Sequence, residues 1–237
     1  MKTLIILPGW NSNKQLWHAF TKMAKDDFDV HVIELPCFGN EPCPNTVWGV
    51  EEYADFVKNK IASIDNKKES IVVLGHSFGG AVATQLIATN PHLADQLILV
   101  GAAIIRPKKS LKRTLFATIA KIGKLLLSFP LLKSLQPLAK KLLYKAADSP
   151  DYQETSGIMK QIYQKIIRQD LTPLLPTITT KTTIIWGKKD TYTPLHYGEK
   201  IHTLLEDSQM HIIEEGTHGL HHEPHLHEFY SLIKTSI

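Results

Sequence analysis

The sequence predicts an α/β fold, in which a mostly parallel sheet carries helices on both faces. Two observations predict it. Short apolar runs rich in β-branched residues, typical of buried strands, alternate along the chain with segments of helical periodicity. The 237 residues, 43% of them hydrophobic, are enough to bury a large core in one domain with an insertion. The expected strands cover residues 3–7, 28–35, 70–74, 96–100, 182–186 and 209–214.

The first expected strand begins at the third residue and ends at Pro8-Gly9. This apolar segment is too short for a signal peptide, and no stretch approaches the ~20 apolar residues of a membrane span. We therefore expect a cytoplasmic protein. The two cysteines, Cys37 and Cys43, lie in the proline-rich loop after the second expected strand, and the sequence leaves open whether they pair.

The third expected strand turns abruptly into a helical run through the sequence Gly75-His76-Ser77-Phe78-Gly79. A turn this short forces its central residue, Ser77, into a strained backbone conformation. The serine hydroxyl then stands exposed above the sheet edge, and the N–H of Phe78 lies at the positive end of the helix. Gly-x-Ser-x-Gly also arises by chance, but the flanking strand and helix favour a nucleophilic serine over a plain glycine-rich turn.

A nucleophilic serine needs a base, and the base needs an orienting acid. Both residue types follow later expected strands, Asp190 after 182–186 and His218 after the last one. Between them, Thr193 is expected to be the N-cap of a helix whose first residue is Pro194. Open parallel sheets place their site residues at such strand ends, although Asp190 taken alone would be interpreted as an ordinary turn residue.

The chain order Ser, Asp, His, each just past a strand, resembles that of the α/β-hydrolase superfamily. The resemblance extends over nearly the whole chain, and Pro8, Glu34 and Cys37 depart from the residues common in the family. Among subfamilies the chain is most similar to small carboxylesterases such as the pimeloyl-acyl-carrier-protein methyl ester esterases. The matching motifs are the first strand and oxyanion loop at 4–10, the Asp-Leu-Pro-Gly-Phe-Gly-like segment at 30–39, the nucleophile elbow at 75–80, the acid loop at 186–190 and the histidine loop at 216–218.

The resemblance implies a serine hydrolase that cleaves carboxylic esters of small to medium acyl chains through an acyl-enzyme. Ser77 would attack the carbonyl carbon while His218 takes its proton, and Asp190 would hold the imidazole in the useful tautomer. The backbone N–H groups of Trp10 and Phe78 would form the oxyanion hole. No metal or organic cofactor is expected in the reaction.

Other residues compete for two of these roles. Five histidines crowd the segment that holds the predicted base, so His221 and His222 are alternatives to it, and a metal site is another interpretation of the cluster. An amphipathic terminal helix that leaves some of these histidines solvated is preferred. Glu34 and Asp95 flank expected strands and compete as the acid. His76, inside the elbow, is expected to be a structural residue beneath the nucleophile.

A long insertion of mainly helical pattern separates the strands 96–100 and 182–186. We expect a hydrolase core at 1–104 and 173–237, and a helical cap, or lid, at 105–172. The apolar stripes of the cap would cover the triad and line an acyl-binding pocket. Its expected helices cover 111–127, 131–146 and 152–168.

Charge is distributed unevenly along the chain. Residues 106–147 hold eleven Lys or Arg and no Asp or Glu, and because the whole chain carries +4, the remainder carries −7. This basic face either solubilises the cap or attracts an anionic membrane surface, an acidic carrier protein or an anionic substrate. Nucleic acid is not an expected partner, because the basic helices lack interleaved aromatic residues.

Three classes of function remain open after the sequence. The favoured one is the ester hydrolase that acts on a small-molecule acyl ester. The second uses the same triad for C–C bond, amide, peptide or thioester hydrolysis or for perhydrolysis, and the third is a triad-bearing receptor that turns over its ligand slowly. The sequence discloses neither the natural substrate, the acyl-chain length and the stereoselectivity, nor the oligomeric state.

Overall fold

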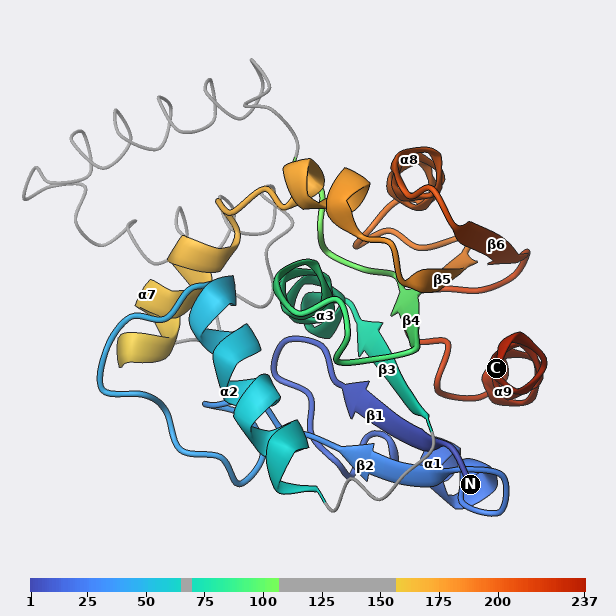
Figure 1. Ribbon diagram of the computed structural model, residues 1–237, viewed down its shortest axis with the longest axis horizontal. Helices are drawn as coiled ribbons and strands as arrows, with labels where there is room; N and C mark the ends of the chain where they lie inside the picture. Colours follow the sequence, from blue (N-terminus) through green and yellow to red (C-terminus); the bar gives the residue numbers. More distant parts are fainter. Residues whose placement is uncertain (65–69, 107–156) are drawn as a thin grey trace, which may run out of the picture.

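The computed structural model describes residues 1–64, 70–106 and 157–237, which form one parallel sheet flanked by helices (Figure 1). The strand order is β2-β1-β3-β4-β5-β6, and every neighbouring pair is parallel. The predicted fold class is therefore confirmed. The strands are β1 Thr3–Leu7, β2 Asp29–Val32, β3 Ile71–His76, β4 Gln96–Val100, β5 Lys181–Gly187 and β6 Ser208–Ile213.

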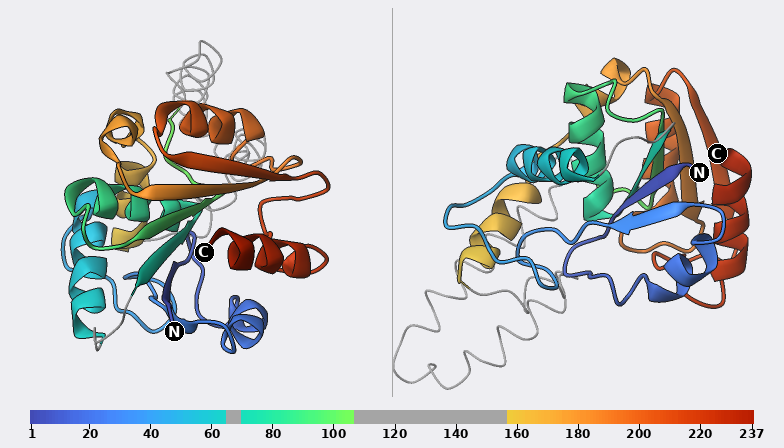
Figure 2. Two further views of the ribbon diagram at one scale, coloured as in Figure 1. Left: turned by 45° about the vertical axis from the view of Figure 1, so that its right-hand side comes forward. Right: turned by 60° about the horizontal axis from the view of Figure 1, so that its bottom comes forward.

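Helices cover both faces of this sheet (Figure 2). Helices α1 and α9 share one apolar cluster with Leu4 and Ile6 of β1, whereas α2, α3 and α8 share the other with Ile5 and Leu7. Successive side chains of a strand point to opposite faces, so each central strand must be apolar throughout to be buried on both sides. The helices are α1 His18–Ala24, α2 Val50–Ser63, α3 Phe78–Thr89, α7 Gly157–Ile166, the 3₁₀ helix η2 Thr172–Thr177, α8 Leu195–Leu204 and α9 Leu226–Ser236.

The insertion between β4 and β5 lies only partly in the described chain. Helix α7 falls within the expected helix 152–168, and its buried Ile162 and Ile166 join the core cluster beneath α2 and α3. The expected cap helices 111–127 and 131–146 lie outside the described residues, as does the basic segment after Arg106. The proposed domain boundaries therefore stay a prediction.

The loop after β2 holds the two cysteines whose pairing the sequence left open. Cys37 and Cys43 form a disulfide, which closes a small loop at this edge of the sheet.

In the ranges 1–64, 70–106 and 157–237, no helix combines the length and apolar character that a bilayer crossing requires. The predicted cytoplasmic location stays a prediction.

Strand β2 ends earlier than the expected 28–35, because the chain turns around the buried carboxylate of Glu34. Its two oxygens accept the N–H groups of Lys14, at 3.0 Å, and of Asn40, at 3.1 Å. Gly39 lies directly over this carboxylate with φ +58°, and a Cβ there would lie 2.2 Å from Oε1 of Glu34. Glu34 thus ties the loop after β1 to the loop after β2.

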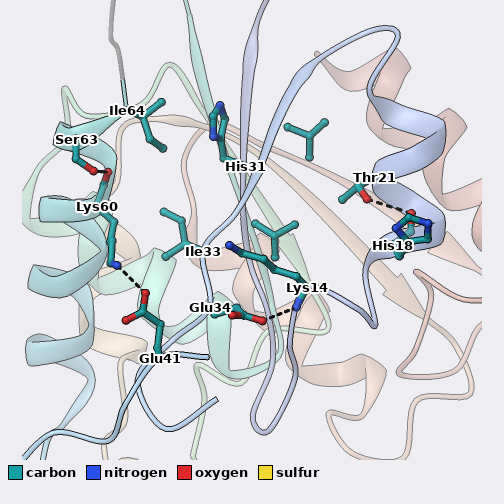
Figure 3. A pocket seen from close by; sticks show the side chains of 12 residues that line it. Lys14, His18, Thr21, His31, Ile33, Glu34, Glu41, Lys60, Ser63 and Ile64 are labelled. Atoms are coloured by element: carbon teal, nitrogen blue, oxygen red, sulfur yellow. Dashed lines mark hydrogen bonds and ion pairs between the residues drawn. The ribbon is translucent and has the colours of Figure 1, made fainter. Parts of the chain in front are cut away.

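A hollow of about 460 Å³ lies beside β2, between α1 and α2 (Figure 3). Glu34 lines it together with Glu41, whose carboxylate pairs with Lys60 at 2.6 Å. Neither Ser77 nor the other two predicted triad residues line this hollow. Glu34 and Glu41 therefore line the same hollow but differ in burial and in hydrogen-bonding partners. Substituting each one separately compares what the two carboxylates contribute to stability.

We expect the substitution Glu34→Ala to lower the free energy of unfolding by about 2 kcal/mol, because two loop N–H groups lose a charged acceptor. Glu41→Ala is the control, since it removes a partly exposed ion pair and should cost less than about 1 kcal/mol. Urea unfolding followed by circular dichroism measures both values. Equal losses in the two variants would show that the Glu34 carboxylate does not hold the loops together.

Candidate active site

Ser77 is the single residue between β3 and α3, and its backbone has φ +52° and ψ −115°. This conformation is disfavoured for any residue with a Cβ, so the surrounding structure must hold it. Its N–H donates to the carbonyl of Val100 at 2.9 Å, and its carbonyl accepts the N–H groups of Gly80 and Ala103. The strained elbow expected from the sequence is present, and the half-buried Ser77 side chain retains access to solvent.

The close approach of α3 to the sheet explains why position 79 of the elbow is a glycine. A Cβ on Gly79 would lie 2.0 Å from the carbonyl oxygen of Leu7, at the end of β1. No other residue type fits at this distance. Helix α3 therefore lies in backbone contact with the end of β1, directly beside the turn that holds Ser77.

The loop after β1 lies against the elbow. A Cβ on Gly9 would lie 3.2 Å from Cβ of Ser77, so the next residue, Trp10, is adjacent to the candidate nucleophile. The indole of Trp10 packs edge-on against Phe38, Phe78 and Tyr163, with ring centroids 4.8, 5.7 and 5.0 Å away. The two segments that carry the predicted oxyanion-hole N–H groups thus meet beside Ser77, with an apolar aromatic wall behind them.

Asp190 and His218 are in direct contact, with Oδ2 of the carboxylate 2.7 Å from Nδ1 of the imidazole. The Asp190 side chain is 1% exposed, and that of His218 is 18% exposed. The other carboxylate oxygen, Oδ1, accepts the N–H groups of Tyr192 at 2.8 Å and Thr193 at 2.9 Å. The acid is therefore fixed by its own loop through Oδ1, while Oδ2 meets the imidazole.

Burial raises the pKa of the Asp190 carboxyl, but the hydrogen bond and charge of His218 and the donors of Thr193 lower it by more. The net result is a pKa below its ordinary value of 3.8. Asp190 is consequently ionised at neutral pH. An ionised carboxylate beside Nδ1 favours the tautomer in which that nitrogen carries the proton and Nε2 is free to act as a base.

Thr193 is not the N-cap that the sequence predicted. Helix α8 begins at Leu195 with Pro194 as its N-cap, and no side chain caps it. The Thr193 hydroxyl lies instead 2.8 Å from Oδ2 of Asp190 and 3.0 Å from the carbonyl of Gly101, and its single proton serves one acceptor at a time. The prediction placed the helix start correctly to one residue but missed that the acid holds this hydroxyl.

Tyr192 is a second residue that the sequence analysis missed. Its ring stacks on the imidazole of His218, with centroids 5.1 Å apart and planes 27° from parallel. Tyr192 is 61% exposed, and its ring lies against one face of the imidazole. An aromatic residue two positions after a candidate acid was the signal available in the sequence.

The competing histidines lie in different surroundings from His218. His221 is buried and stacks on Trp17 with ring centroids 4.1 Å apart, whereas His222 is exposed. His76 is buried beneath the elbow and donates from Nε2 to the carbonyl oxygen of His218 at 2.9 Å. Within the described ranges, no group of three or more His, Cys, Asp or Glu residues is arranged to hold a metal ion.

The competing acids are engaged away from the imidazole. Glu34 binds the two loop N–H groups described above, and Asp95 accepts the N–H of Ile71 at 2.8 Å. The structure therefore brings Asp190 to His218, and it connects His218 to Ser77 through His76, the residue that precedes the serine.

Comparison with known proteins agrees with the observed fold. Residues 2–224 match the family model of the alpha/beta hydrolase fold. Over 232 residues the chain is 25% identical to the pimeloyl-[acyl-carrier protein] methyl ester esterase of Neisseria meningitidis serogroup C, an alignment that covers 92% of this chain and 87% of that protein.

Two solved structures illustrate the range of the fold. An esterase from Exiguobacterium antarcticum superposes with a TM-score of 0.73 at 20% identity, covering 100% of this chain and 92% of that one. A bromoperoxidase from Bacillus anthracis superposes with a TM-score of 0.75 at 17% identity, covering 99% and 91%. At these identities the likeness concerns the fold, which proteins of different activities share.

Proposed function

The chain belongs to the alpha/beta hydrolase fold family, and on this basis we propose that it is a serine hydrolase that cleaves carboxylic esters. The observation that carries the proposal is the buried, ionised Asp190 held against His218, whose loop is joined through His76 to the strained strand-to-helix turn of Ser77. A surface turn would not need a buried carboxylate, a positive φ and a stacked imidazole together. An ionised carboxylate held against an imidazole is how a base for a serine hydroxyl is oriented.

In the proposed reaction, Oγ of Ser77 attacks the ester carbonyl carbon while Nε2 of His218 takes the hydroxyl proton. Asp190 stabilises the imidazolium that forms. The N–H groups of Trp10 and Phe78 bind the oxyanion, each contributing on the order of 3 kcal/mol in the transition state.

The tetrahedral intermediate then collapses. The C–O bond to the leaving group breaks, and His218 gives its proton to the departing alcohol, which leaves an acyl-enzyme on Ser77. Water attacks that ester while His218 accepts one of its protons. The bond between the acyl carbon and Oγ of Ser77 then breaks, His218 returns the proton to Oγ, and the acid product leaves the regenerated serine.

Two observations support an acyl ester as the substrate, and the proposal takes its acyl chain to be of small to medium length. The aromatic rings of Trp10, Phe38, Phe78 and Tyr163 pack together next to the elbow, and an acyl chain would lie against them. The Neisseria relative and the Exiguobacterium neighbour are both named as esterases.

Two measurements on the wild-type protein test the proposal. We expect hydrolysis of p-nitrophenyl esters across a series from acetate to octanoate, and stoichiometric labelling by an alkyl phosphonate on the peptide that contains Ser77, seen by mass spectrometry. Hydrolysis of a thioester or of a C–C bond, but not of any ester, would favour the second class of function. Ligand binding with neither turnover nor labelling would favour a receptor.

A further inference from the structure

We propose that His76 is a positioning residue, whose Nε2–H holds the main chain of His218 in register with the nucleophile elbow. This inference rests on the proposed function, in which His218 is the base. His76 is the last residue of β3 and directly precedes Ser77. A single side chain therefore connects the peptide that carries the nucleophile to the loop that carries the base.

The hydrogen bond fixes the tautomer of His76. Its Nε2 lies 2.9 Å from the carbonyl oxygen of His218, and because a carbonyl only accepts, Nε2 must carry the proton. The other nitrogen, Nδ1, is buried and has no hydrogen-bond partner in the described part of the chain. Within the described part of the chain, the buried His76 side chain therefore makes its hydrogen bond to the carbonyl of His218.

His76 also stays neutral. Burial, and then the nearby charge of His218, lower its pKa to about 3. At neutral pH the ring therefore donates a constant hydrogen bond. When His218 becomes protonated during the reaction, it faces an uncharged ring whose centroid is 4.8 Å away, and which does not compete for the proton.

Packing prevents the His76 ring from turning away. Its centroid lies 6.0 Å from that of Trp17 and 4.9 Å from that of His221, and these two rings are themselves stacked. Trp17 is completely buried and His221 is 4% exposed. The donor is therefore held rigidly between the sheet and the histidine loop.

His218 is consequently attached at two points. Asp190, after β5, holds its imidazole, and His76, at the end of β3, holds its backbone carbonyl. The loop that carries His218 follows β6, the edge strand of the sheet that the described residues form. A displacement of about 1 Å between reacting groups is enough to lower a rate by ~10²-fold, so the second attachment matters for catalysis.

Three variants test the proposal. His76→Phe fills the same space without a donor, whereas His76→Gln keeps an amide N–H that reaches the carbonyl. His221→Phe is the matched control, because it replaces another buried imidazole of the same cluster that makes no hydrogen bond to His218. Kinetics with a p-nitrophenyl ester give kcat and KM, thermal unfolding gives stability, and NMR gives the Nδ1 proton signal of the His218–Asp190 hydrogen bond.

We expect His76→Phe to lower kcat by ~100-fold with KM changed by less than about 3-fold, His76→Gln to recover activity to within ~10-fold, and His221→Phe to stay within ~3-fold of wild type. The Nδ1 proton signal should broaden or disappear in His76→Phe and remain in His221→Phe. If His76→Phe does not fold, His76→Asn replaces it, because its shorter amide does not reach the carbonyl.

The inference is wrong if the donor-free variant keeps the wild-type kcat and Nδ1 signal, or if its activity falls only as much as that of His221→Phe at equal loss of stability. A wild-type protein without ester turnover would instead contradict the proposed function. In that case the NMR comparison still decides whether His76 holds His218 in place.

Discussion

Replacing Ser77 with alanine is expected to lower kcat for a p-nitrophenyl ester by on the order of 10⁶-fold. The proposed acyl-enzyme needs this oxygen, and no other group of the elbow can replace it. The fold should be retained, because alanine carries the same Cβ at φ +52° as the serine that it replaces. Steady-state kinetics, with circular dichroism to confirm folding, measure the effect.

Ser63→Ala is the control for the Ser77 variant. Ser63 lies at the end of α2, where its hydroxyl donates to the carbonyl of Lys60, and its loss should change kcat by less than about 2-fold. A Ser77→Ala protein that keeps more than about a hundredth of the wild-type kcat would place the nucleophile elsewhere in the chain. Phosphonate labelling of that variant would then identify the serine that reacts.

The second large effect is expected from replacing Asp190 with asparagine, which should lower kcat by ~10⁴-fold. The asparagine side chain has nearly the same shape, but its amide no longer stabilises the imidazolium and favours the wrong tautomer of His218. The control is Asp95→Asn, since Asp95 competed as the acid but binds the N–H of Ile71. It should keep kcat within about 3-fold, and equal losses in both variants would contradict the assignment of Asp190.

The same substitution has a pH dependence in stability. Because the folded-state pKa of Asp190 is lower than the ordinary value of 3.8, ionisation of this carboxyl stabilises the folded protein above about pH 4. That stabilisation is lost as the pH falls through the folded-state pKa. The difference in unfolding free energy between wild type and Asp190→Asn, measured by urea titration, should therefore be smaller at pH 3 than at pH 7. A constant difference would mean that the carboxylate charge is not stabilising.

Most of the sheet could be predicted from the sequence, because its signals are local. The apolar runs of β1, β3, β4 and β5 are buried on both faces and stand out from their surroundings, and the abrupt turn after β3 shows in five consecutive residues. Such patterns depend on neighbours along the chain, so an isolated sequence displays them. The strained conformation of Ser77 follows from the same shortness of the turn.

What the sequence missed depends on the three-dimensional path of the chain. The pairing of His76 with the carbonyl of His218 joins positions 142 residues apart. Thr193 was expected to cap a helix because its local pattern allows that, but the tertiary structure directs its hydroxyl to Asp190. Cys37 and Cys43 are close in the chain, yet only the path of the loop after β2 decides that they pair.

The positive φ of Ser77 implies that catalytic activity and the stability of the fold are opposed at this position. Glycine tolerates such a backbone without strain, and relief of ~1–3 kcal/mol would exceed the ~0.5–1 kcal/mol that it loses through greater freedom of the unfolded chain. A Ser77→Gly protein should therefore melt at a higher temperature than the wild type while hydrolysing nothing. A search for heat-tolerant variants that ignored turnover would drift toward inactive molecules at this residue.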